Sequence, residues 1–309
     1  MSQDATLEHA SKQVRAALSN EAKRPAIASF FDHASNTVSY LVWDRASHLA
    51  AVIDPVLGFD AASGRTDTDM AEKIVERAEA ENLDVQWLIE THAHADHLSA
   101  GPYLQEQLGG KIAIGSEITH VQDVFGTIFN EDERLTRDGS QFDHLFADGD
   151  TFALGEVEAT ALYVPGHTPA DMAFIIGDAA FVGDTLFMPD YGTARADFPG
   201  GDARELYRSI RRLLSLPEET RLFLCHDYKA PGRDEYAWET TVQQQRTGNV
   251  HVRDGMSEDE FVAMREARDA TLGMPTLILP SIQVNIRAGH LPEPEGNGVS
   301  YLKIPVNGL

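Results

Sequence analysis

Short apolar stretches recur along the chain and end at turn residues, as expected for β-strands. Val38, Tyr40 and Val42 occupy alternate positions, and residues 49–53 form an apolar run that stops at Asp54-Pro55. Because only a short polar segment separates these two stretches, we expect them to form an antiparallel pair. Further strands are expected at residues 87–89, 112–114, 158–164, 172–176, 180–182 and 222–224.

Segments with a helical period lie between the expected strands. One helix is expected to begin near Asp67 or Thr68. It would place Met70, Ile74 and Ala78 on one face. Others are expected at residues 101–108 and after the capping sequences at 202–205 and 257–260. Two strand-rich halves, each with helices, predict an α/β fold in which two mixed sheets pack face to face with helices outside.

The chain shows no internal repeat, low-complexity tract or long linker. We therefore expect one domain over residues 26–309, including a C-terminal helix and tail, after an N-terminal extension over residues 1–25. Leu7, Val14 and Leu18 would lie on one face of a short surface helix in this extension. There is no apolar run of signal-peptide length and no stretch long enough to span a membrane, so we expect a cytoplasmic protein.

The charge balance narrows the classes of partner. Among 309 residues, 25 are Lys or Arg and 49 are Asp or Glu, which gives a formal net charge of −24. The chain has no basic block to neutralise phosphates, so we expect it to bind neither nucleic acid nor membranes. Its single cysteine, Cys225, reads as a small core residue. With no Cys-x-x-Cys present, a metal must be held by His and carboxylate side chains.

The segment from Glu90 to His97 concentrates metal-ligand residues directly after the apolar stretch at 87–89. His92 and His94 point the same way in an extended loop, so both imidazoles can face one metal. A tight turn would bring Asp96 and His97 to a second position nearby. A solvated polar loop is the plain alternative, but such loops rarely concentrate histidine in this way.

Three isolated ligand-type residues also follow strand patterns. His167 comes after Val164-Pro165-Gly166, Asp184 follows Phe181-Val182-Gly183, and His226 follows residues 222–225. Each alone is more often a turn or capping residue. Together they follow one rule, in which a buried strand delivers a ligand to the rim of a rigid scaffold.

The set His-x-His-x-Asp-His, Gly-His-Thr, Gly-Asp-Thr and a late histidine resembles the metallo-β-lactamase superfamily over nearly the whole chain after about Phe30. The resemblance implies an αββα sandwich with a metal site at the edge between its two sheets. It does not fix the chemistry, because one fold hosts several reactions.

Two branches of this superfamily would display all seven ligand-type residues. A thioester hydrolase of the glyoxalase II kind would hold two metals and attack a carbonyl carbon with a metal-activated hydroxide. One metal would use His92, His94 and His167, the other Asp96, His97 and His226, with Asp184 bridging. A persulfide dioxygenase would hold a single Fe(II) through His92, His167 and Asp184 as its catalytic face, with positions open for sulfur and O₂. His94, Asp96, His97 and His226 would then orient water or the iron ligands.

Flanking motifs favour the dioxygenase branch. Residues 53–57, 64–67, 90–101, 226–232 and 283–289 look like bacterial persulfide dioxygenases. Residues 192–198 are similar to that family's Gly-Cys-Gly-Arg-Thr-Asp-Phe stretch but depart from it at Thr193, Ala194 and Ala196. The resemblance implies a non-haem iron enzyme, with one Fe(2+) per chain, that oxidises glutathione persulfide with O₂ to sulfite and glutathione. It also suggests a homo-oligomer, a dimer or higher.

Arg195 and Tyr207 match positions of the family's glutathione contacts, so the resemblance implies that they bind substrate. Arg195 can hold a carboxylate in its fork, and its plain alternative is a surface ion pair with Asp197. Tyr207 offers a hydroxyl, and its plain alternative is helix packing. Asp54 either forms hydrogen bonds around the site or simply ends a strand before Pro55. A non-catalytic metal sensor is disfavoured, because seven ligand-type residues exceed the needs of one closed site.

Overall fold

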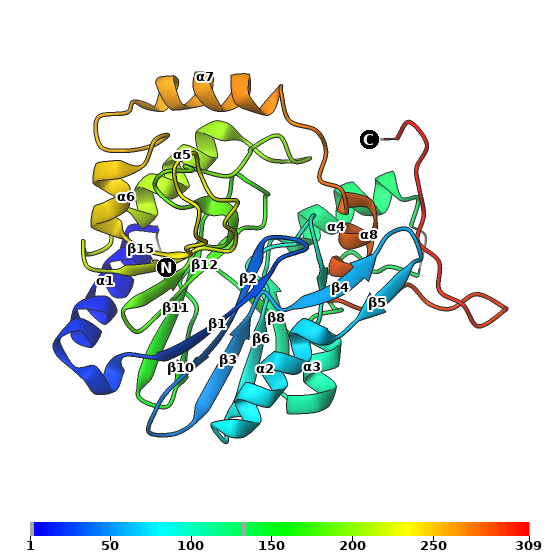
Figure 1. Ribbon diagram of the computed structural model, residues 1–309, viewed down its shortest axis with the longest axis horizontal. Coiled ribbons are helices and arrows are strands. Elements are labelled where there is room, and N and C mark those ends of the chain that lie inside the picture. Colours follow the sequence, from blue (N-terminus) through cyan, green and yellow to red (C-terminus); the bar gives the residue numbers. More distant parts are fainter. Residues whose placement is uncertain (1–2, 132–133, 309) are drawn as a thin grey trace.

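Two six-stranded sheets pack face to face through a shared apolar layer in the computed structural model, which describes residues 3–131 and 134–308 (Figure 1). The layer takes Tyr40 from one sheet and Phe181 and Phe223 from the other, with ring centroids 5.2 and 5.5 Å from that of Tyr40. Helices cover the outer faces of both sheets. The expected arrangement of two mixed sheets between helices is confirmed.

The first sheet has the order β1-β2-β3-β6-β8-β9. Its strands are β1 (Ala26–Asp32), β2 (Thr37–Trp43), β3 (Leu49–Ile53), β6 (Asp84–Ile89), β8 (Lys111–Gly115) and β9 (His144–Phe146). β1, β2 and β3 are antiparallel, which confirms the expected pair, and β3, β6, β8 and β9 are parallel. A small sheet of β4 (Val56–Asp60), β5 (Arg65–Asp67) and β7 (Leu98–Ser99) lies beside it.

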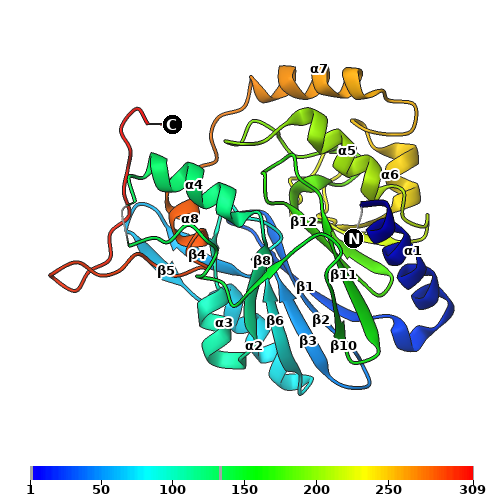
Figure 2. The same ribbon diagram turned by 180° about the vertical axis from the view of Figure 1, so that it is seen from behind.

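The second sheet has the order β10-β11-β12-β13-β14-β15, and Figure 2 shows it from the opposite side. Its strands are β10 (Thr151–Leu154), β11 (Val157–Tyr163), β12 (Met172–Ile176), β13 (Ala179–Phe181), β14 (Arg221–Phe223) and β15 (Glu239–Thr241). Only β13 and β14 run parallel in this sheet. The strands expected at 158–164, 172–176, 180–182 and 222–224 are therefore confirmed to within about a residue at each end.

Eight α-helices and two 3₁₀ turns occur among the described residues. They are α1 (Gln3–Ser19), η1 (Glu21–Lys23), α2 (Asp69–Ala80), α3 (Gly101–Leu108), α4 (Ile118–Ile128), η2 (Gly183–Thr185), α5 (Ala203–Leu213), α6 (Val242–Gly248), α7 (Glu258–Asp269) and α8 (Ile278–Asn285). The Asp202 carboxylate accepts from the backbone of the first turn of α5, and Ser257 and Glu260 form a reciprocal capping box on α7. Local capping thus sets where both helices begin.

The N-terminal helix α1 belongs to the outer layer of the second sheet. Ala10 and Val14 are fully buried in the apolar cluster beneath α5. Gln13 donates from Nε2 to the carbonyl oxygens of Glu158 and Ile175, at 2.8 and 2.9 Å. Residues 1–25, expected as an extension, therefore include a helix that packs into the sandwich. None of the helices described here is both long and apolar enough to cross a membrane.

Candidate metal centre

Strands from both sheets end at the same edge of the sandwich and deliver the ligand-type residues there. The loop after β6 carries His92, His94, Asp96 and His97. The loop after β11 carries His167, η2 after β13 carries Asp184, and His226 follows β14. The backbone N–H of Met172 donates to the carbonyl oxygen of Thr91 at 2.9 Å, which ties the two sheets together beside these loops. Residues far apart in the sequence therefore meet in one centre.

His92, His167 and Asp184 converge on a single point. Their ligand atoms all lie within 4.8 Å of one another. The three residues are 1, 6 and 8% exposed, and neither Nε2 of His92 nor Oδ1 of Asp184 has a hydrogen-bond partner among the described residues. Buried polar atoms without partners are rare unless an ion or water satisfies them. Two imidazoles and one carboxylate in this arrangement fit a divalent metal such as Fe(II).

Neighbouring groups fix which ring nitrogen of each histidine faces the centre. Nδ1 of His167 donates to the carbonyl oxygen of Arg195 at 2.8 Å, because a carbonyl can only accept. Nδ1 of His92 lies 3.0 Å from Oγ1 of Thr91, whose hydroxyl donates to Oδ2 of Asp54 at 2.9 Å. Nε2 of both rings is left with its lone pair toward the centre, as metal-binding histidines require.

Asp54 is the anchor beneath the centre. It adopts a left-handed backbone conformation with φ of 51°. Its Oδ1 accepts from the backbone N–H of Thr91 at 2.7 Å and from Nε2 of His94 at 2.9 Å. Burial opposes charge on both partners, but their mutual attraction lowers the pKa of Asp54 and raises the pKa of His94 well above its ordinary value. Asp54 therefore does more than end a strand.

The remaining ligand-type residues adjoin the triad. Oδ2 of Asp96 lies 3.5 Å from Nδ1 of His97 and 3.4 Å from Nε2 of His226. Nε2 of His226 is also 3.3 Å from Oδ1 of Asp184. Although burial opposes the charge on Asp96, His226 and His97 lower the pKa of this carboxyl well below its ordinary value. All seven candidate ligands thus occupy one continuous cluster.

Residues 34–226 match the family model described as the Metallo-beta-lactamase superfamily. The chain belongs to this superfamily. A probable metallo-hydrolase of Burkholderia pseudomallei is 57% identical to it, over 92% of this chain and 99% of the relative. The protein is thus an enzyme of the metallo-β-lactamase superfamily with a His/Asp cluster suited to metal binding.

Other superfamily members carry names of different activities. Glyoxylase B2 of Dictyostelium discoideum is 45% identical, over 94% of this chain and 99% of the relative. A mitochondrial persulfide dioxygenase of Homo sapiens is 28% identical, over 85% and 88%. The crystal structure of ETHE1 from Myxococcus xanthus has a TM-score of 0.67 and 28% identity, and covers 86% of this chain and all of that one. The expected resemblance to the superfamily and to its persulfide dioxygenases is therefore confirmed.

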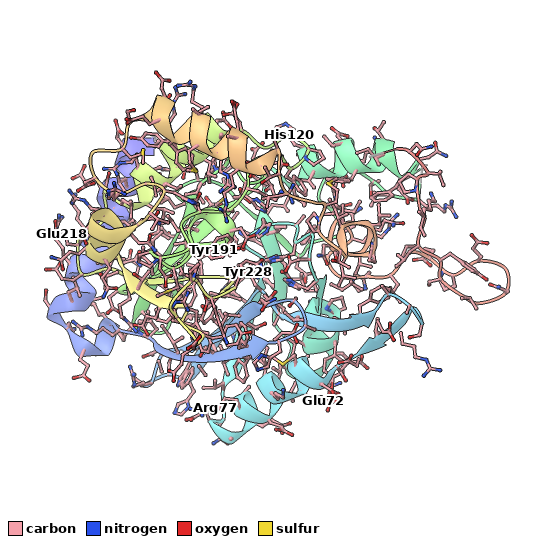
Figure 3. All side chains as sticks on the ribbon, turned by 45° about the horizontal axis from the view of Figure 1, so that its top comes forward. Glu72, Arg77, His120, Tyr191, Glu218 and Tyr228 are labelled. Atoms are coloured by element: carbon pink, nitrogen blue, oxygen red, sulfur yellow. The ribbon has the colours of Figure 1, made fainter. Side chains whose placement is uncertain are left out.

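A crevice of about 910 Å³ opens onto the candidate metal centre. His167 and Asp184 lie in its floor, and Phe187, Tyr191 and Tyr228 form part of its wall. Tyr191 and Tyr228, labelled in Figure 3, have ring centroids 5.4 Å apart. Partial burial of Tyr228, which is 41% exposed, together with the nearby Asp96 and Asp184 carboxylates, raises the pKa of its phenol above the ordinary value and keeps it protonated.

Sequence reasoning did not single out these aromatic residues. Tyr228 stands two positions after His226 within the motif at residues 226–232, and this proximity could have identified it as a residue of the site. Phe187 and Tyr191 lie in an irregular segment between η2 and α5, where hydrophobic periodicity gives no signal. The wall of the crevice therefore becomes visible only in the fold.

Arg195 lies on the crevice wall, but its guanidinium is already occupied. Nε and Nη2 pair with the two carboxylate oxygens of Asp197 at 2.5 and 2.7 Å, and Nη1 donates to the carbonyl oxygen of Gly273 at 2.7 Å. The ion pair weighed as the plain alternative is present. A substrate carboxylate could reach this fork only by displacing Asp197 or by sharing it.

Tyr207 requires a correction, because the structure does not bring it to the crevice. It lies on α5, packs its ring against Phe261 of α7 with centroids 5.5 Å apart, and donates its hydroxyl to the carbonyl oxygen of Met256 at 2.8 Å. The expectation of a substrate contact was wrong, because this face of α5 is covered by α7. The helix-packing alternative describes it.

Proposed function

We propose that the protein is a non-haem iron dioxygenase that oxidises glutathione persulfide with O₂. In the overall reaction, glutathione persulfide, O₂ and water give glutathione, sulfite and two protons. The observation that carries this proposal is the convergence of His92, His167 and Asp184, whose ligand atoms lie within 4.8 Å of one another, with His167 and Asp184 lining the crevice. Two histidines and a carboxylate on one face are typical of Fe(II) oxygenases and leave positions open for two reactants. The similarity to the human and Myxococcus xanthus proteins supports the same assignment.

When bound by this triad, Fe(II) supplies the one-electron chemistry that O₂ needs in order to react with sulfur. The protein's own groups supply orientation. Thr91 and the Arg195 carbonyl oxygen hold His92 and His167 in the required tautomers. The aromatic wall of Phe187, Tyr191 and Tyr228 limits the access of water to the sulfur end of the substrate.

The glutathione part of the substrate would extend along the crevice. Arg268 of α7 lines it, with its guanidinium 6.0 Å from the centroid of the Tyr191 ring. Because Arg195 and Arg265 are paired with Asp197 and Asp269, we assign the main contact to a substrate carboxylate to Arg268. Arg195 would add a weaker contact by sharing its fork.

A dinuclear thioester hydrolase of the glyoxalase II kind is the second candidate. Nδ1 of His94, Nε2 of His97 and Nε2 of His226 are buried and lack hydrogen-bond partners among the described residues, as the additional ligands of a two-metal centre would. The names of the Burkholderia and Dictyostelium relatives also favour hydrolysis. The two candidates differ in their stoichiometry of metal and in their use of O₂.

One experiment separates the two candidates. Protein purified without air or chelator is supplied with freshly made glutathione persulfide in an oxygen electrode, and in parallel with S-lactoylglutathione. The dioxygenase assignment requires O₂ uptake with sulfite release, and about one iron per chain. Thioester cleavage without O₂ uptake, in protein that holds two zinc ions, would establish the hydrolase instead.

A further inference from the structure

Helix α7 carries a buried ion pair that contacts the loop between η2 and α5. Arg265 and Asp269 lie one turn apart and are 1 and 5% exposed. Nε and Nη2 of Arg265 both donate to Oδ1 of Asp269, at 2.9 and 2.6 Å. A buried ion pair contributes little net stability, because each charge loses its hydration. A reason beyond the packing of α7 is therefore expected for this pair.

The remaining contacts of the pair lie on the loop backbone. Asp269 is the last residue of α7, where the helix dipole disfavours a carboxylate. Its second oxygen, Oδ2, accepts from the backbone N–H of Ala196 at 2.9 Å. Arg265 donates from Nη1 to the carbonyl oxygen of Thr193 at 3.1 Å. The ion pair thus fixes the loop at both ends of residues 193–196.

One peptide group connects the Asp269 carboxylate with the metal centre. The carbonyl oxygen of Arg195 accepts from Nδ1 of His167 at 2.8 Å, and the N–H of Ala196, which donates to Asp269, belongs to the same amide plane. Because the amide is delocalised, a hydrogen bond from its N–H to an anion increases the negative charge on its carbonyl oxygen. The Arg195 oxygen is therefore a stronger acceptor for the imidazole N–H of His167.

We propose that Asp269 is a positioning residue of the metal centre that acts on His167 through the peptide between Arg195 and Ala196. Its carboxylate favours the tautomer with the proton on Nδ1 of His167 and raises the affinity of Nε2 for a divalent cation. A carboxylate that accepts directly from a metal-binding imidazole has the same effect, and here a peptide group lies between the two. The inference rests on the metal centre of the proposed function, and it applies to one metal or two, because His167 is a ligand in both arrangements.

Zn²⁺ binding to the metal-free protein, measured by competition with a chelator, tests the role of this charge. Asp269→Asn keeps an oxygen that can accept from Ala196 but removes the negative charge. We expect the affinity for the tightest-bound Zn²⁺ to fall roughly tenfold, the lower end of the range for groups that support metal ligands. Asp178→Asn is the matched control, because Asp178 is 2% exposed, pairs with Arg221 at 2.9 Å and precedes β13 at the end opposite η2. Equal affinities in the two variants would overturn the inference.

A second variant guards against a loss of folding in Asp269→Asn, which leaves the charge of Arg265 buried without its partner. The double variant Arg265→Met/Asp269→Asn removes both charges, and the replacement of a buried ion pair by neutral groups is often tolerated. Circular dichroism checks its fold, and it should show the same roughly tenfold loss of affinity. A folded double variant with wild-type affinity would refute the role of the carboxylate.

NMR of the Zn²⁺-loaded protein with isotope-labelled histidine separates an effect on His167 from a general loss of structure. In the wild type, Nδ1 of His167 should carry a proton with a downfield resonance, as a strong hydrogen bond produces. This resonance should move upfield in Asp269→Asn and keep its position in Asp178→Asn. Binding of Zn²⁺ through Nδ1 in the wild type, or an unmoved resonance in Asp269→Asn, would contradict the inference. Neither measurement uses O₂ or a persulfide, so the outcome is independent of the dioxygenase proposal.

Discussion

The backbone carbonyl oxygen of Arg195 holds Nδ1 of His167 at 2.8 Å, although 28 positions separate the two residues. The same residue anchors its guanidinium to Asp197 and to the carbonyl oxygen of Gly273. One residue thus orients a candidate metal ligand through its backbone and fixes part of the crevice wall through its side chain. The two roles can be separated, because a substitution removes only the second.

Arg195→Ala should leave the iron content unchanged and raise KM, because the carbonyl oxygen that orients His167 remains while the contact to Gly273 is lost. Arg268→Ala should raise KM by about tenfold, the larger effect, since a charge-assisted contact is lost. Oxygen-electrode kinetics with parallel iron analysis measure both. Arg253→Ala, on the surface outside the crevice, serves as the control. Loss of iron in Arg195→Ala would contradict the division of roles.

Asp184→Ala should abolish iron binding, whereas His226→Ala should retain about one iron per chain. Asp184 belongs to the triad, but His226 is a ligand only in the dinuclear arrangement. Elemental analysis of the two anaerobically purified variants gives the answer. Equal loss of metal from both would favour two metals and the hydrolase.

Asp54→Asn should weaken metal binding by roughly 10- to 100-fold without unfolding the protein. Asparagine tolerates the positive φ of 51° at this position, but it cannot accept from Thr91 and His94 with the strength of a carboxylate. Competition with a chelator measures the change in affinity. If affinity stays at the wild-type level, Asp54 does not act through these contacts.

The stability of the folded protein should depend on His251. Burial, followed by the charges of Arg265 and Arg268, lowers the pKa of His251 to about 4. The unfolded chain takes up this proton near pH 6.5, so it binds more protons than the folded chain between about pH 6.5 and 4. The stability is therefore full above about pH 6.5, and up to about 3 kcal/mol is lost as the pH falls toward 4.

Urea unfolding of the metal-free protein at several pH values measures this dependence. His251→Asn keeps an acceptor for the backbone N–H of Thr193 and should show a shallower loss below pH 6.5. His120→Asn is the matched control, because the His120 side chain is 64% exposed. A slope in His251→Asn equal to that of the wild type would show that another group is responsible.

The strand ends that carry His92, His167, Asp184 and His226 were predictable because each follows a short apolar run that stops at polar or turn residues. The contacts that surround individual side chains could not be predicted from the sequence. Tyr207 occupies a helix position that the sequence defines, but what covers it is Met256 and Phe261, which lie about 50 positions later. The support of His167 by Arg195 is a backbone contact, which no side-chain pattern encodes.

The candidate metal centre links the two sheets at the edge of the sandwich, because its ligands lie on loops from both sheets. His92 follows a strand of the first sheet, whereas His167 and Asp184 follow strands of the second, and a backbone hydrogen bond from Met172 to Thr91 crosses between them. An ion bound by all three would hold the sheets together only in the folded chain. The melting temperature of the protein therefore serves as a gauge of metal occupancy, readable in crude preparations before any substrate is chosen.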